Sequence, residues 1–505
     1  MHGPQRPPCE DGQVRSAPAA ETGLSAGRKR AILAATVLGS SLTFIDGSAL
    51  GVALPAIQND LGAGPAAALW ISNAYLLTLG ALVLTGGAAG DRFGRRRVFL
   101  IGVVLFALAS VACGLAPTVD LLIAGRALQG IGAALLTPGA LALIGATFPP
   151  EERGRAFGTW AGAGALFGMA GPLIGGWLAD NADWRAIFWI NVPLAALTIA
   201  VALRAVPESR DPDAQRLDVP GAVLAVAGLA ALTWALTAAP DLGWTDPTVM
   251  IGLLGGVALC AAFLMVEARA AHPMMPLDLF RSPVFSGINL LTMLLYFALG
   301  GAMFFLPFDL IRVQGWTATQ AGAAMLPFAV VMGLFSGVAG RIADRFGARL
   351  SLTLGPLLTG AGLIALAVPG RGAGFVDGPL VGMTVMAVGM TLAVGPLTAA
   401  VMGAVEPGHT GVASGVNNAV ARIAGLLAVA LLGVVLSAVF VQAVDQPDGR
   451  ARLGQVMAGS GALDDAAKDA FHAAFRWVMA ISAACGLLAG LVGLLTAPGR
   501  AQSAA

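Results

Sequence analysis

Residues 87–97 read GAAGDRFGRRR, and residues 340–349 read GRIADRFGAR. Both segments share the frame G-x-x-x-D-R-F-G with a trailing arginine, and each directly follows the second of six apolar runs. Glycines permit a tight turn, arginines suit anionic headgroups, and an aspartate can accept hydrogen bonds from a helix N-terminus. One copy alone would be an ordinary positively charged loop, but two copies at equivalent positions indicate an internal duplication.

The runs around these turns have the length and composition of membrane helices. Of the 505 residues, 57% are hydrophobic and 11% are charged, against about 25% charge in soluble domains. A bilayer core of about 30 Å needs roughly 20 apolar residues per helix. Fourteen segments meet this length and are predicted as helices: about 31–57, 66–88, 98–116, 120–147, 156–179, 185–205, 219–238, 248–267, 284–311, 319–340, 350–368, 379–404, 410–440 and 471–496.

The predicted fold is therefore an all-α membrane protein with two pseudo-symmetric six-helix bundles. The bundles span 31–205 and 284–496, and two additional central helices lie within 219–267. Residues 1–30 are predicted to form a disordered cytoplasmic tail, and 441–470 the longest polar loop. With the N-terminus inside, more than two thirds of the 29 Lys and Arg residues fall on the cytoplasmic side. This bias predicts that both termini are cytoplasmic.

Several function classes are disfavoured. A net charge of +1 argues against a nucleic-acid partner. The four cysteines are scattered without zinc or disulfide spacing, and the four histidines are too few and dispersed for a metal site. The chain has no phosphate-cradling G-x-x-x-x-G-K-[ST] and no nucleophile elbow. We therefore expect neither an enzyme nor a cofactor.

The turn at 87–97 resembles the signature of the major facilitator superfamily between its second and third helices. Residues 121–134 (LLIAGRALQGIGAA) are similar to the family's fourth-helix motif R-x-x-Q-G, through Arg126 and Gln129. In the fifth helix, residues 171–176 (GPLIGG) resemble the motif that separates the family's antiporters from its symporters. Its members here are Gly171, Pro172, Gly175 and Gly176, although Phe167 stands where the family has a further glycine.

Residues 184–193 (WRAIFWINVP) are similar to the W-R-x-I-F-x-I-N-V-P string of the fourteen-helix drug:proton antiporter branch. Asp46-Gly-Ser48, followed by Ala-Leu-Pro at 53–55, resembles the branch's first-helix motif, with serine in place of threonine. The thirteenth helix, with Asn417 and Arg422, also looks like this branch. The resemblance covers about residues 31–496.

The resemblance implies a conformational latch in the two duplicated turns, carried by Asp91, Arg92, Gly94, Arg95, Asp344 and Arg345. Asp91 is expected to face the start of the thirteenth helix near residues 410–413. By pseudo-symmetry, Asp344 is expected to face the start of the fifth helix near residues 154–157. A helix N-terminus carries a partial positive charge and unpaired N–H groups, so an aspartate there is stabilised.

Asp46 and Asp309 are the two acids found at depth in the predicted helices, and they are the candidates for proton coupling. Burial raises the pKa of a carboxyl group in general, which lets such a group exchange protons near neutral pH. Arg126 is costly in lipid and needs a carboxylate or a wet cavity. Together with Gln129, Arg422 and Asn417 it is predicted to form a charge network. Arg312 could pair with Asp309. The alternatives are a structural hydrogen bond at Asp46, an ion pair at the membrane boundary for Asp309, and an arginine at 126 that reaches one surface.

The resemblance implies proton-coupled efflux of hydrophobic or cationic drugs or antibiotics across the cell membrane, by alternating access between the two bundles. Its expected partners are a small-molecule substrate, protons and the lipid bilayer. Two alternatives stay open: a dedicated exporter of one endogenous metabolite, and a non-transporting membrane receptor.

Overall fold

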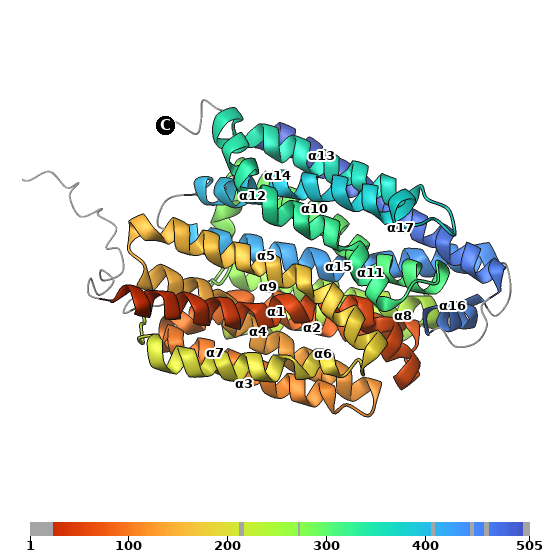
Figure 1. Cartoon of the computed structure of the whole chain (residues 1–505), viewed down its shortest axis with the longest axis horizontal. Coiled ribbons are helices and arrows are strands. Elements are labelled where there is room, and N and C mark those ends of the chain that lie inside the picture. Colours follow the sequence, from red (N-terminus) through yellow and green to blue (C-terminus); the bar gives the residue numbers. More distant parts are fainter. Residues whose placement is uncertain are drawn as a thin grey trace, which may run out of the picture.

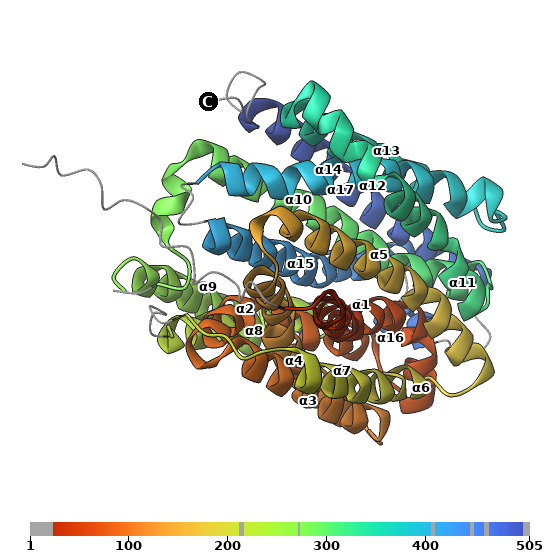
Figure 2. The same cartoon turned by 60° about the vertical axis from the view of Figure 1, so that its left-hand side comes forward.

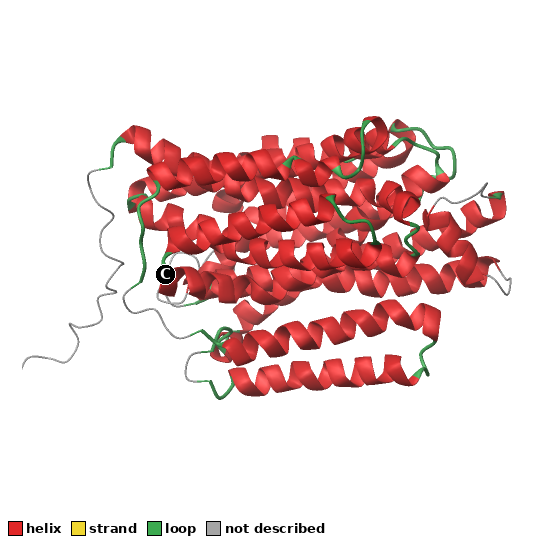
Figure 3. Cartoon of the chain, turned by 90° about the horizontal axis from the view of Figure 1, so that it is seen from below, coloured by secondary structure: helices red, strands yellow, loops and turns green. Residues whose placement is uncertain are grey.

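The computed structural model describes residues 24–211, 217–270, 273–405, 410–444, 449–458 and 464–497. In these ranges the chain is helix and loop, and fourteen helical spans are long and apolar enough to cross a membrane. The helices lie side by side along one direction, as Figures 1 and 3 show. The fourteen-helix, all-α prediction is confirmed.

The N-terminal bundle is coloured red to yellow in Figure 1. Its helices are α1 (Ala26–Leu61), α2 (Pro65–Phe93), α3 (Arg95–Gly114), α4 (Val119–Thr147), α5 (Pro150–Asn181), α6 (Ala186–Trp189) and α7 (Asn191–Ala205). The sixth predicted helix is thus interrupted at Ile190. The two additional helices are α8 (Val219–Leu242) and α9 (Pro247–Glu267).

The C-terminal bundle is coloured green to blue. It contains the short η1 (Leu277–Arg281), then α10 (Pro283–Phe308), η2 (Asp309–Val313), α11 (Ala318–Ala324), α12 (Leu326–Phe346), α13 (Ala348–Ala367), η3 (Val376–Leu380), α14 (Val381–Gly403), α15 (Thr410–Val444), α16 (Gly449–Ala458) and α17 (Asp465–Thr496). The ninth predicted helix, α10, ends in the π-helical turn η2.

The duplicated turns have the same geometry in both bundles. Gly94 and Gly347 have φ of 107° and 91°, which only glycine adopts without strain. Beyond each turn, an arginine at the start of the next helix binds a backbone carbonyl near the end of its own bundle. Arg96 donates to the Val206 carbonyl at 3.1 Å, and Arg349 to the Leu494 carbonyl at 2.7 Å. The duplication in the sequence is therefore a duplication in structure.

The additional helices lie at the edge of the molecule (Figure 2). Ala225 and Leu229 of α8 pack against Leu77 and Ala81 of α2 and Leu426 of α15. Few residues of α9 are buried, as expected for a helix that faces lipid. The two helices therefore cover a seam between the bundles without entering either core.

One predicted loop contains a helix. Within 441–470, α16 turns Leu453, Val456 and Met457 into the core, each at most 4% exposed. These three apolar residues recur at helical spacing, but polar neighbours hide the pattern over so short a segment. In Figure 1, α16 lies at the end of the bundle opposite the C-terminus.

Candidate functional site

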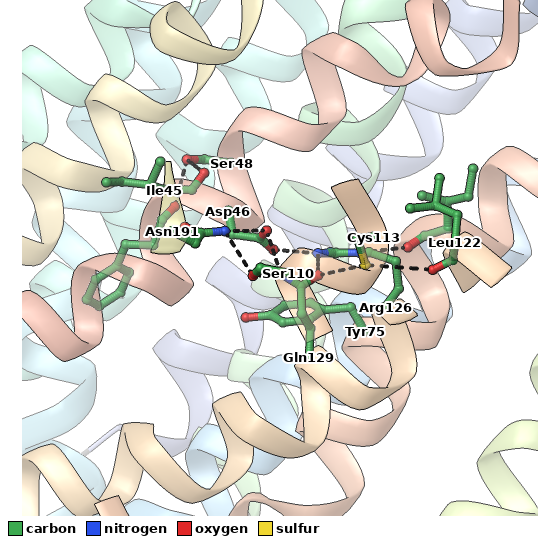
Figure 4. A network of polar contacts seen from close by, with 12 residues as sticks. Ile45, Asp46, Ser48, Tyr75, Ser110, Cys113, Leu122, Arg126, Gln129 and Asn191 are labelled. Carbon is green, nitrogen blue, oxygen red and sulfur yellow. Dashed lines mark hydrogen bonds and ion pairs between the residues drawn. The ribbon is translucent and has the colours of Figure 1, made fainter. Parts of the chain in front are cut away.

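Asp46 lies at the centre of a buried polar cluster in the N-terminal bundle (Figure 4). Its carboxylate forms an ion pair with Arg126 of α4, and both side chains are at most 1% exposed. Gln129 Nε2 donates to Asp46 at 3.1 Å, and Asn191 Nδ2 donates to it at 3.3 Å. Ser110 of α3 accepts from Gln129 at 2.7 Å. The α4 and α7 side chains thus bind the α1 carboxylate directly, and Ser110 of α3 joins the same cluster through Gln129 and Asn191.

The guanidinium group of Arg126 has several further partners. Besides the ion pair, it donates to Gln129 Oε1 at 2.7 Å and to the Ile71 carbonyl of α2 at 3.1 Å. The Tyr75 ring lies 4.4 Å from its guanidinium carbon, and the Phe188 ring 6.0 Å. A buried charge is tolerated only when it is paired and hydrogen-bonded. Without its partner, either charge here would be left in an apolar surrounding.

Glycines bring these helices close enough for the cluster to form. A Cβ at Gly130 would overlap Thr78 and the Tyr75 carbonyl of α2. A Cβ at Gly132 would lie 2.7 Å from the backbone nitrogen of Phe106 in α3. The R-x-x-Q-G motif therefore combines two polar side chains with the small residues that let α2 and α3 approach them.

The other two members of the predicted charge network lie elsewhere. Asn417 of α15 donates to Asn289 and Thr292 of α10, at 3.1 Å and 2.7 Å. Arg422 is half-buried where α15 crosses Gly80 of α2, within electrostatic range of Tyr75 and Tyr296. The predicted network is thus divided between the Asp46 cluster, a C-terminal amide cluster and an arginine between the bundles.

Asp309, the second predicted acid, is also buried, in the C-terminal bundle. Its Oδ1 lies 2.8 Å from Nδ1 of His472 on α17, and its side chain is 4% exposed. The suggested partner, Arg312, directs its Nε to the Met457 carbonyl at 3.1 Å and a terminal nitrogen to the Pro55 carbonyl at 2.7 Å. His472 was missed because it lies 163 residues from Asp309.

The glycines of the fifth-helix motif are contact points. A Cβ at Gly171 would overlap Ser48 of α1, and a Cβ at Gly175 would lie 2.6 Å from the Ala49 carbonyl. Gly176 packs against the Ala318 backbone of α11, and Gly322 of α11 packs against the backbone of Pro172. The motif therefore joins α5 to α1 within its own bundle and to α11 in the other bundle.

Asp180, one turn beyond this motif, caps a helix of the other bundle. Its carboxylate accepts from the backbone nitrogens of Ala318 and Thr319, at 3.1 Å and 2.7 Å, and from the Thr319 hydroxyl at 2.6 Å. The sequence predicts an aspartate at a helix N-terminus of the opposite bundle, but at the duplicated turns. Asp180 is not among the predicted residues, and it lies at the other end of the molecule.

The duplicated turns make the following contacts. Asp91 forms an ion pair with Arg95 of the same turn, at 2.8 Å, and its side chain is 41% exposed. Arg92 and Arg345 lie over the rings of Phe93 and Phe346, at 5.6 Å and 5.4 Å. A Cβ at Gly94 would lie 2.7 Å from the carboxylate of Glu208. Residues 406–409, just before α15, and the side chain of Asp344 are outside the described part of the chain.

Three further buried polar residues are not among the predicted site residues. Ser110 and Asn191 join the Asp46 cluster, and the only signal for them was the W-R-x-I-F-x-I-N-V-P string that contains Asn191. Glu267 is 2% exposed at the end of α9 and accepts from the Met275 backbone nitrogen at 3.0 Å. Glu267 is the last residue of α9, next to a polar linker, and so it is not an acid at depth in a helix like Asp46 and Asp309. Among the described residues, no group of His, Cys, Asp and Glu is arranged to hold a metal.

Comparison with known proteins is consistent across sequence and fold. A model of the Major Facilitator Superfamily matches residues 36–429. The multidrug resistance protein Stp of Mycobacterium tuberculosis is 35% identical over 408 residues, covering 80% of this chain and 75% of that protein. The tetracenomycin C resistance and export protein of Streptomyces glaucescens is 35% identical, covering 81% and 76%. The methylenomycin A resistance protein of Streptomyces coelicolor is 35% identical, covering 84% and 90%.

Solved structures share the fold at low sequence identity. A bacterial homologue of the human lysosomal transporter Spinster superposes with a TM-score of 0.64 at 19% identity, covering 94% of this chain and all of that one. The POT family transporter PepTSo gives a TM-score of 0.65 at 15% identity, covering 95% and 99%.

Proposed function

The chain belongs to the Major Facilitator Superfamily, and from this premise we propose that it exports small molecules in exchange for protons. It is a multi-pass membrane transporter and not an enzyme. The proposed substrates are hydrophobic or cationic drugs and antibiotics, since three relatives are named for multidrug or antibiotic resistance. The proposed location of the protein is the cytoplasmic membrane, with both termini in the cytoplasm.

The buried ion pair of Asp46 and Arg126 carries this proposal. When Asp46 is ionised, the two charges cancel, and Gln129 and Asn191 complete the hydrogen bonding of the carboxylate. A proton on Asp46 removes the negative charge and leaves the Arg126 cation against the Tyr75 and Phe188 rings. Because an unpaired buried charge costs several kcal/mol, proton occupancy changes the preferred packing of α1 against α4. This is the property that proton coupling requires.

The contacts between the bundles support alternating access. At the end that carries α16, Asp180 caps α11 and Arg312 reaches the Pro55 carbonyl of α1. We assign this end to the outside, so that the structure represents a state closed toward the exterior. Substrate release to the outside requires these contacts to separate, and outside protons then bind and favour reclosure.

Transport in reconstituted vesicles tests the proposal. An imposed pH gradient should drive accumulation of a cationic dye by the wild type, and Asp46→Asn should abolish this accumulation while the protein still inserts and folds. Asp120→Asn serves as a matched control, because Asp120 is an exposed aspartate in the first turn of α4. Gradient-driven transport at the wild-type rate in Asp46→Asn would rule out Asp46 as the coupling group.

A second candidate is the export of one endogenous metabolite, which the name of the tetracenomycin C resistance and export protein favours. A panel of unrelated drugs separates the two. Transport of many panel members supports drug efflux, and transport of one compound supports the dedicated exporter. Absence of flux for every compound would favour the receptor alternative.

A further inference from the structure

Asp309 and His472 form a buried pair in the C-terminal bundle, separate from the Asp46 cluster. Nδ1 of His472 lies 2.8 Å from Asp309 Oδ1, and Nε2 lies 3.0 Å from the carbonyl oxygen of Pro369. The His472 and Asp309 side chains are 11% and 4% exposed. Both ring nitrogens therefore face oxygen atoms, with little room for water to replace either partner.

The number of protons in the pair follows from these contacts. A carbonyl oxygen has no hydrogen to donate, so Nε2 must carry one and donate it to Pro369. The short contact between Nδ1 and Asp309 needs a second hydrogen, either on Nδ1 or on the carboxyl group. Either arrangement holds one proton more than a neutral imidazole beside a carboxylate. We propose that Asp309 and His472 form a one-proton binding site, here called the proton clasp, whose occupancy closes the end of the molecule that carries α16.

The link to closure is the π-helical turn η2. Asp309 is its first residue, and Arg312 in the same turn donates to the Met457 carbonyl of α16 and the Pro55 carbonyl of α1. Removal of the proton sets a lone pair of Nδ1 against a carboxylate oxygen, which turns an attraction into a repulsion. The turn then loses its anchor on α17, and the bond from Arg312 to the opposite bundle is weakened.

The charged groups around the clasp come from a few elements. On α17, Lys468 lies one turn before His472 and Arg476 one turn beyond it. Asp465 and Asp469 are paired with Arg371 of the loop that follows α13. From η2 comes Arg312, and Arg452 of α16 is paired with Asp464. The helices α10 and α11 contain no acidic or basic residue, and α13 and α15 contribute only Arg349 at the far end and Arg422 near mid-helix.

The clasp fits the direction of the proposed cycle, and in that respect it rests on the proposed function. An exporter driven by outside protons needs proton binding to close the outer end before the proton can be released inside. The clasp meets that need because it holds one proton when this end is closed. When the proton leaves, Asp309 and His472 repel each other and the closed state is destabilised. The count of protons itself depends only on the contacts of the pair.

Asp309→Asn tests the clasp because an amide N–H can make the hydrogen bond that the bound proton makes. The amide N–H can donate to Nδ1 while Nε2 still donates to Pro369, so the variant reproduces the loaded pattern without a titrating carboxyl group. His472→Ala removes the pair. Asp377→Asn is the matched control, since Asp377 is an exposed acid of η3 in the same bundle and at the same end.

Distances between spin labels report closure of this end. Labels at Pro117→Cys and Gly374→Cys lie in exposed loops of the two bundles, in a chain whose native cysteines are replaced. Between about pH 5.5 and about pH 9, the wild type should shift from short to long distances. One proton changes the ratio of the two states by at most about tenfold per pH unit. Asp309→Asn should keep the short distance throughout, His472→Ala should show no pH dependence, and Asp377→Asn should follow the wild type.

A wild-type pH profile in Asp309→Asn overturns the clasp. Nitrogen-15 NMR spectra of histidine-labelled wild type test the clasp in the unaltered protein. The His472 signal is assigned by its loss in His472→Gln. A neutral ring with its hydrogen on Nδ1 at low pH also overturns it. Hydrogen on both ring nitrogens, or on Nε2 beside a protonated Asp309 carboxyl group, supports it. The label distances need no substrate. Absence of drug transport with intact pH-dependent closure therefore refutes the proposed function alone, and a wild-type pH profile of the distances in an Asp309→Asn variant that still exports drugs refutes the clasp alone.

Discussion

Replacement of Asp180 should open the end of the molecule that carries α16. Its carboxylate accepts three hydrogen bonds at the N-terminus of α11, at 3.1, 2.7 and 2.6 Å, and all three cross between the bundles. Loss of a helix cap costs about 0.5–2 kcal/mol, and the interaction of a carboxylate with the helix dipole adds about 0.3–1 kcal/mol. Since Asp180 is exposed, we expect a combined loss of about 1–2 kcal/mol in Asp180→Ala.

This loss falls only on the closed state, because the bundles separate in the open one. At about 1.4 kcal/mol per factor of ten, the ratio of open to closed molecules should rise about 5- to 30-fold. Asp180→Asn keeps one acceptor oxygen and should give a smaller rise.

The label pair at positions 117 and 374 measures this ratio directly, at a fixed low pH so that the proton clasp stays loaded. Asp120→Asn is the control, an exposed aspartate at the same end of the molecule. An unchanged distance distribution in Asp180→Ala would refute the reasoning, since the three bonds would then contribute nothing to closure.

Three further predictions concern other contacts. Arg126→Lys should reduce transport at least about tenfold, because one ammonium cannot reach Asp46, Gln129 and the Ile71 carbonyl together as the guanidinium does. Initial transport rates in vesicles measure this effect, and rates near wild type would contradict the prediction. Asp46→Asn should lower the thermal unfolding midpoint, because it leaves the buried Arg126 charge uncompensated, at a cost of about 3–5 kcal/mol. Asp46→Asn with Arg126→Gln should recover part of that loss without recovering transport, and equal midpoints in both variants would contradict this. Gly175→Ala should disrupt the packing of α5 on α1 and lower transport. Gly168→Ala on the same helix should be tolerated, because a Cβ there meets open space. Equal transport rates in these two variants would refute the contact argument.

Another experiment tests the role of the duplicated turns. Asp91→Asn should strongly reduce turnover if Asp91 contacts the start of α15 in another conformation, and wild-type turnover would show that the turn serves topology alone. Its ion pair with Arg95 in this structure gives the reference state for that comparison.

The sequence predicted the helices well because the membrane imposes a simple rule. A span needs about 20 apolar residues, and fourteen such segments were visible. The side-chain partners followed no such rule. Asp46 and Arg126 were both singled out, each for the cost of burying its charge, and yet 80 residues separate them. The local sequence pattern does not predict which helices contact one another.

The contacts of the C-terminal bundle were harder still to predict. His472 lies among alanines and aromatic residues on an amphipathic face, where a histidine has no distinctive signature. Asp180 reads as a polar residue at a helix end, and only the position of α11 gives it a role. The helix α16 was hidden because ten residues are too few for a reliable periodic signal.

The separation of Asp46 from Arg126 along the chain has a consequence for biogenesis. During synthesis α1 reaches the insertion machinery first, with an aspartate near its middle and its arginine still to be translated. An ionisable residue at the centre of a helix costs about 2.5–3.5 kcal/mol on insertion, which the apolar residues of α1 must offset until α4 follows. The nascent first helix is therefore held in the bilayer only provisionally, and it acquires its permanent position when α4 arrives with the missing charge.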